Sequence, residues 1–128
     1  MAARRPVFVD FDGERRPLLL PIGQVRALEI ARGAGIAEIF RRVTDGRFYL
    51  DDLRESIRLG LEGGGMPPHE ATERVMRVFD PAYLGVFVAT VSALLASVFE
   101  GLPESWPGEP QAESAAPATT PRFTSPGP

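Results

Sequence analysis

Residues 51–68 read DDLRESIRLGLEGGGMPP and combine a helical pattern with a signal that ends a helix. Leu53 and Ile57 lie four residues apart, with further leucines in phase, so one face of the segment is apolar. The carboxylates at its start suit the positive end of a helix dipole. We therefore predict a helix over residues 51–62, with Asp51 as its N-cap and a break in the chain after it.

The three glycines and two prolines that follow raise the question of a phosphate-binding loop. A P-loop needs a lysine and a strand that leads into the glycines. All 14 basic residues of this chain are arginines, the preceding element is helical, and proline lacks the backbone N–H that would bind phosphate. We therefore predict no cofactor site here and interpret Gly63, Gly64 and Gly65 as a helix end and a hinge.

Three further helices are predicted by periodicity and by their boundary residues. Residues 23–32 end at a glycine, residues 36–44 carry apolar side chains at helical spacing, and residues 68–79 start with a proline in the first helical position. Upstream of them, residues 7–20 show the period of two that is typical of strands, interrupted by the turn signal Asp12-Gly13. This pattern predicts a β-hairpin. Its register stays open. A four-residue loop would place four side chains on one face, namely Val7, Val9, Leu18 and Leu20. We expect that a tighter turn would not.

The last predicted helix, residues 81–100, is the most hydrophobic element, with Asp80 as its expected cap. Residues 81–99 contain no charge and are close to the roughly 20 needed to span a bilayer. Polar side chains within them and the lack of flanking basic clusters argue against a membrane span. We expect this helix to be either the central core helix of the domain or a helix that packs one face on the core and binds a partner with the other. The side chains predicted to bind a partner are Leu84, Phe87, Val88, Val91, Leu95 and Phe99.

Composition changes near residue 102, so we expect a single small domain over residues 1–102. Residues 103–128 are rich in Pro, Ser, Ala and Thr, and such a segment buries too little apolar surface to offset its ordering entropy. We therefore predict a disordered tail. Trp106 and Phe123 are its only large apolar side chains, and an adaptor role for the tail would rest on them alone.

The residue types present exclude several classes of function. There is no cysteine, hence no disulfide or thiolate metal site, and the net charge of -3 with no basic run beyond two residues argues against nucleic-acid binding. His69 is the single histidine and is expected on the surface. The carboxylate groups are explained by turns and helix starts in solvated parts of the chain: Asp10 with Asp12, and Asp51 with Asp52 and Glu55. We predict no catalytic residues, metal or cofactor. Because aspartates follow the first arginines before any long apolar run, we expect a cytoplasmic protein.

The order of these features resembles a known family over about residues 6–102. It is carried by the hairpin with its Asp-Gly turn, the sequence Leu28-Glu29-Ile30, the stretch from Asp51 to Gly65, the restart DPAYLG and the hydrophobic last helix. This order is similar to that of the small tail proteins of gene transfer agents and siphovirus-like prophages. Those proteins are classed as tail assembly chaperones and are also labelled tail tube proteins.

The resemblance implies an α+β, mostly helical fold and a non-enzymatic role in building a tail. A chaperone of this kind would coat the tape measure protein until tube subunits replace it, and it would bind other tail proteins or itself. A structural tail tube or minor tail component is the alternative, although tube subunits need extensive β-sheet. A small membrane-associated protein that uses residues 81–99 is a further alternative of a different class.

Overall fold

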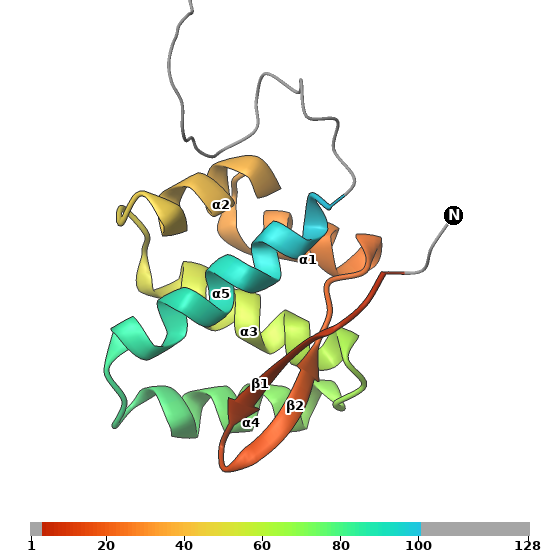
Figure 1. Cartoon of the computed structure of the whole chain (residues 1–128), viewed down its shortest axis with the longest axis vertical. Helices are drawn as coiled ribbons and strands as arrows, with labels where there is room; N and C mark the ends of the chain where they lie inside the picture. The colour runs from red at the N-terminus through yellow and green to blue at the C-terminus, as the bar shows by residue number, and fades with distance from the viewer. Residues whose placement is uncertain (1–3, 101–128) are drawn as a thin grey trace, which may run out of the picture.

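The structure, a computed structural model, describes residues 4–100 (Figure 1). A two-stranded antiparallel sheet precedes the helices, so the predicted α+β, mostly helical class is confirmed. The predicted tail, residues 103–128, lies outside the described residues. In chain order, the elements are β1 (Val7–Phe11), β2 (Glu14–Leu18), α1 (Ile22–Arg32), α2 (Ile36–Thr44), α3 (Leu50–Gly63), α4 (Pro68–Phe79) and α5 (Leu84–Val98).

The hairpin closes through a two-residue turn. Asp12 and Gly13 both have positive φ, 55° and 77°, as this turn requires. The register pairs Val7 with Leu18 and Val9 with Arg16, so the two valines and Leu18 do share a face. Our expectation that a tight turn would separate them is therefore wrong, because loops that differ by two residues preserve the alternation of faces.

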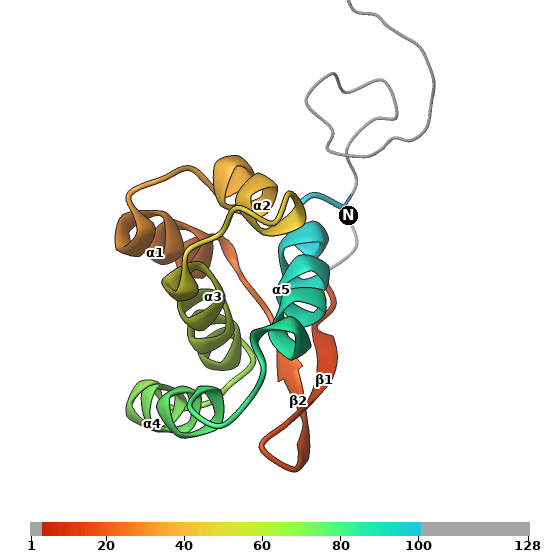
Figure 2. The same cartoon turned by 90° about the vertical axis from the view of Figure 1, so that its left-hand side faces the viewer.

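α3 lies at the centre of the molecule, with α5 and the hairpin on one side of it and α4 across its far end (Figure 2). It contacts α1, α2, α4, α5 and β2. Its buried side chains include Leu53, Ile57, Leu59 and Leu61, so it is buried nearly all round. The expectation that the last helix is the central one is thus corrected: α3 has this place because its apolar positions face several neighbours.

The glycines of α3 let the hairpin lie directly on the helix. Leu19 N donates a 3.0 Å hydrogen bond to the Gly60 carbonyl. A Cβ on Gly63 would stand 1.9 Å from the Leu19 carbonyl oxygen, and one on Gly64 would stand 2.1 Å from that of Pro17. The structure therefore shows close packing at two of the three glycines that we interpreted as a hinge; whether the segment moves stays a prediction.

Gly65 ends α3 through its backbone conformation and not through close packing. Its φ of +116° turns the chain, while Met66 N donates to Leu61 O and Gly65 N donates to Glu62 O, each at 3.0 Å. This pair of bonds is the Schellman arrangement, which satisfies the last carbonyls of a helix. α4 then starts at Pro68, as expected.

α5 begins three residues later than the sequence indicates. Asp80 and Pro81 form a turn that follows α4, and Tyr83 is the N-cap of α5. The chain needs this turn to reverse direction between α4 and α5 (Figure 1). Across the reversal, the rings of Phe79 and Phe87 stack with centroids 3.9 Å apart. None of the helices among residues 4–100 is both long enough and apolar enough to cross a bilayer.

Candidate interaction surface

The structure distributes the six predicted partner-binding residues between core and surface. Phe87, Val91 and Leu95 are buried, Val88 and Phe99 pack partly buried against the core, and Leu84 is 41% exposed. The broad stripe of large side chains on α5 therefore faces α2, α3 and the hairpin, where it buries most apolar area. A partner that reached Phe87, Val91 or Leu95 would have to open the core. Binding by this set stays a prediction.

An open groove lined by five apolar side chains together with Arg54 and Asp80 lies where α3 begins, α4 ends and α5 begins. Its volume is about 490 Å³. Three of its apolar side chains stand well out of the core: Met76 is 59% exposed, Leu50 44% and Leu84 41%. Phe79 lies at its base, held by the stack on Phe87. The lining residues, called the apolar groove below, are Leu50, Arg54, Met76, Phe79, Asp80, Ala82 and Leu84.

The outward face of α5 continues this apolar character. Val86 is 64% exposed and lies on one face with three exposed alanines, Ala89, Ala93 and Ala96, because their spacing is i, i+3, i+7 and i+10. No residue of α5 is charged. Tyr83, 86% exposed, stands at the start of this face beside the groove. Together these residues and the apolar groove form what we call the apolar surface.

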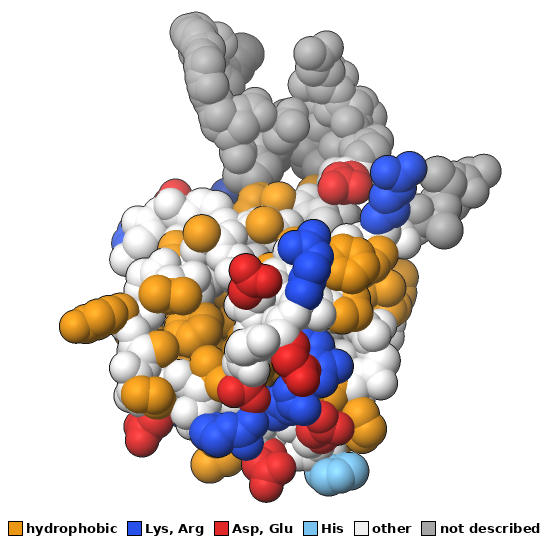
Figure 3. Space-filling view, turned by 60° about the horizontal axis from the view of Figure 1, so that its bottom comes forward, with side chains coloured by type: hydrophobic (Ala, Val, Ile, Leu, Met, Phe, Trp, Pro, Cys, Tyr) orange, Lys and Arg blue, Asp and Glu red, His pale blue; other side chains and the backbone are white. Residues whose placement is uncertain are grey.

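Figure 3 shows that the molecule separates apolar and charged side chains on this side. Hydrophobic side chains gather where α4 passes into α5, and charged ones crowd over the hairpin and α4. The charged region is an ion-pair network: Arg74 lies 3.1 Å from Glu14 and 2.8 Å from Glu70, and Arg77 lies 2.5 Å from Asp12. The Arg74 hydrogen bond, with the nearby Arg16 charge, lowers the pKa of the Glu14 carboxyl. This network joins α4 to the hairpin.

Only a weak signal in the sequence marks the exposed apolar residues. Met76 follows the buried Val75 on α4, yet it lies outside the core because α3 covers only part of that helix. Val86 carried the clearer signal, since it is a large side chain on the small-residue face of α5. Tyr49, Leu50 and Tyr83 sit at helix starts, where periodicity says nothing about exposure.

Asp52 is the main departure from the expected surface carboxylates. It is fully buried, and Tyr49 rather than Asp51 is the N-cap of α3. The Asp52 carboxylate accepts hydrogen bonds from Arg32 Nε at 2.8 Å, Arg42 Nη1 at 3.1 Å and the Tyr49 backbone N–H at 2.8 Å. These contacts join α1 and α2 to the start of α3. Every oxygen of the carboxylate faces a donor, so these contacts hold the three helices together.

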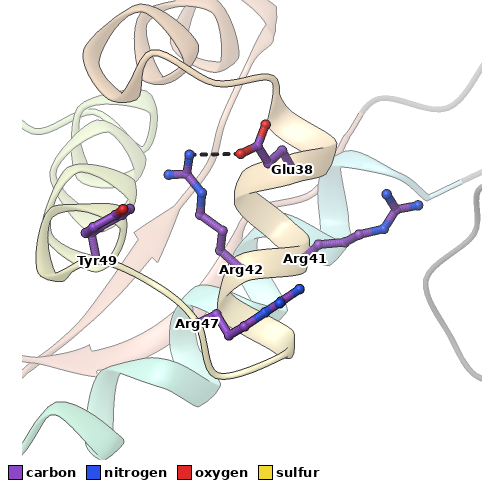
Figure 4. Close-up of a pocket in the computed structure, with 5 residues that line it drawn as sticks. All are labelled: Glu38, Arg41, Arg42, Arg47 and Tyr49. Carbon is purple, nitrogen blue, oxygen red and sulfur yellow. Dashed lines mark hydrogen bonds and ion pairs between the residues drawn. The ribbon is translucent and has the colours of Figure 1, made fainter.

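A second pocket, which we call the arginine pocket, lies on the other side of Tyr49 (Figure 4). Its volume is about 510 Å³, and Glu38, Arg41, Arg42, Arg47 and Tyr49 line it. The Arg42 guanidinium stands 5.4 Å from the Tyr49 ring centroid and 3.0 Å from Glu38. The hydrogen bond from Arg42 to Glu38 raises the pKa of Arg42 above its usual value. The pocket therefore presents fixed positive charge beside an aromatic ring that is 65% exposed.

The single histidine lies apart from both pockets. His69 is exposed in the first turn of α4. Among residues 4–100, no three His, Cys, Asp or Glu side chains gather in a way that could hold a metal ion.

Comparison with known proteins places the fold and these surfaces in context. The family model described as phage tail tube protein, GTA-gp10, matches residues 5–101. The chain belongs to this family of phage tail proteins. Its match covers every described element, so the predicted relation to gene transfer agent and phage tail proteins is confirmed, and with it a role in the structure or assembly of a tail. No curated protein and no solved structure matches the chain.

Proposed function

We propose that this protein is a tail assembly chaperone that binds an apolar helical segment of another tail protein, the tape measure. The observation that carries the proposal is the apolar surface. It combines a groove between three helices with an uncharged helix face. Exposed apolar patches rimmed by charge mark sites of protein binding.

The shape of the surface supports a helix as the bound segment. An amphipathic helix binds a groove through anchors at i, i+3, i+4 and i+7, and the groove offers contacts from Leu50, Met76 and Leu84. Arg54 and Asp80 also line it, so the partner helix can be oriented by charges of opposite sign. Many copies bound along one long partner reach high avidity while each contact stays reversible.

The alternative within the same family is a structural tail tube component, and the family description itself favours it. In that case the apolar surface would join copies of this chain. Against it stands the small sheet content, because within residues 4–100 the only sheet is a pair of five-residue strands. We further propose that the protein is not an enzyme and acts in the cytoplasm of the host cell during particle assembly.

Co-purification with the tape measure protein encoded in the same genome tests the chaperone function. We expect wild-type protein to co-purify with it and keep it soluble. Met76→Glu and Val86→Glu should abolish both effects, because a buried unpaired carboxylate opposes binding. Ile30→Glu is the matched control: Ile30 is 74% exposed on α1, outside the apolar surface, and its substitution should leave binding unchanged.

Equal binding by Met76→Glu, Val86→Glu and wild type would reject the apolar surface as the site. No association with the tape measure by any of the proteins would reject the chaperone function itself.

A further inference from the structure

The arginine pocket is not explained by the apolar surface, since it lies on α2 and the link that follows it. It offers two recognition elements together: arginine side chains and the exposed Tyr49 ring. Arg42 is held in place by Asp52 and Glu38, so its position against the ring is fixed without a ligand. Aromatic surfaces of this kind bind proline-rich segments, and arginines bind carboxylates.

The chain itself carries a segment of matching composition. Residues 103–113 read PESWPGEPQAE, with three prolines, three glutamates and one tryptophan. The whole of residues 101–128 contains the same three glutamates and one arginine, which leaves it two charges negative. Its carboxylates therefore complement the arginines, and its prolines and Trp106 complement Tyr49.

The described chain ends close to the arginine pocket. Phe99, just after α5, stacks on Phe40 of α2 with ring centroids 5.4 Å apart, and Arg41 is the next residue of that helix. α2 is nine residues long, about 13 Å at 1.5 Å per residue. Six extended residues beyond Glu100 span about 20 Å, so Trp106 can reach any part of the pocket.

We propose that residues 103–113 bind the arginine pocket of the same molecule, with Trp106 against Tyr49 and the glutamates against Arg41 and Arg47. Covalent connection gives the segment an effective concentration in the millimolar range, so weak contacts are enough to populate the bound state. The contact would cover Tyr49, which directly precedes Leu50 of the apolar groove. The proposal does not depend on the chaperone function.

Trp106 fluorescence tests the proposal in the full-length protein, because it is the only tryptophan in the chain. We expect Trp106 to be protected from acrylamide, a neutral quencher, and the protection to weaken with salt. Arg47→Glu and Tyr49→Ala should each raise the quenching constant towards that of free N-acetyltryptophanamide. Arg26→Glu makes the same charge change at an exposed position on α1 and should leave protection intact.

Charge exchange supplies the decisive variant. Glu104→Arg with Glu109→Arg should lose protection, and adding Arg47→Glu should restore part of it. Circular dichroism melts of each variant confirm that the domain is folded. Equal quenching in wild type and Arg47→Glu would overturn the proposal. Protection that disappears on dilution would overturn it as well, because the pocket would then hold the segment of another copy.

Discussion

At the scale of single residues, Asp52 shows how a charge inside this fold is stabilised. Its carboxylate has no exposure to water, and two guanidinium groups and one backbone N–H surround it. Both arginines keep some contact with solvent, with side chains 17% and 19% exposed. Removing the carboxylate would leave two cations facing each other without their shared partner.

We expect Asp52→Ala to lower the free energy of unfolding by about 3 kcal/mol, the lower end for breaking a buried pair, because the arginines can turn to water. Asp51→Ala is the matched control, since Asp51 is exposed and pairs with Arg54 at 3.7 Å. It should cost at most about 1 kcal/mol. Urea denaturation measures both, and similar losses for the two variants would show that Asp52 is not the residue that joins α1, α2 and α3.

A second prediction at this scale concerns Gly63. Because its added Cβ would meet a backbone oxygen at 1.9 Å, Gly63→Ala must displace the chain after β2. We expect a loss of about 3 kcal/mol, the upper part of the range for overpacking. Gly85→Ala, in a helix with nothing within 4 Å of the new Cβ, should instead stabilise by about 0.5–1 kcal/mol. Thermal unfolding distinguishes them; a neutral Gly63→Ala would favour the hinge interpretation over close packing.

At the scale of elements, the joint between the hairpin and α4 is electrostatic. Arg74 and the nearby Arg16 charge lower the pKa of Glu14 from its ordinary value of 4.5. A carboxyl with a lowered folded pKa stabilises the fold above its unfolded pKa, and the effect is lost as pH falls through the folded pKa. The hairpin should therefore be held on α4 more firmly at neutral pH than in acid.

Glu14→Gln tests this joint. We expect a lower melting temperature than wild type at pH 7 and a difference that shrinks as the pH falls from 4.5 through the lowered folded pKa of Glu14, below which the wild-type carboxyl is also neutral. Glu73→Gln, at an exposed position on α4, controls for the change in net charge. A difference that persists unchanged in acid would mean that the Glu14 charge does not contribute.

At the scale of the whole molecule, the chaperone and tube functions differ in where the protein ends up. A chaperone leaves before the tail is complete, whereas a tube component stays in it in many copies. We expect mass spectrometry to find the chain in lysates of particle-producing cells and to find little of it in purified particles. Abundance in purified particles comparable to that of the other tail proteins would favour the tube function.

Local patterns in the sequence were enough for the elements. Helical spacing and boundary residues such as Pro68 and Gly33 indicate α1 to α4 closely, because capping and periodicity depend on neighbours within a few residues. The start of α5 was misplaced at Pro81, since nothing local shows that the chain needs three residues there to reverse. The family resemblance likewise rests on the order of motifs along the chain.

The sequence by itself determined the class of fold, the absence of cysteine chemistry and the relation to phage tail proteins. Only the tertiary structure decided which faces meet solvent. Periodicity identifies two sides of α5 but not their neighbours, so Phe87 and Val91 proved to be core and Val86 surface. Asp52 is buried because α1 and α2 bring Arg32 and Arg42 to it from 20 and 10 residues away, and Gly63 faces Leu19 across 44 residues. Such contacts depend on how whole elements pack, and no local pattern records them.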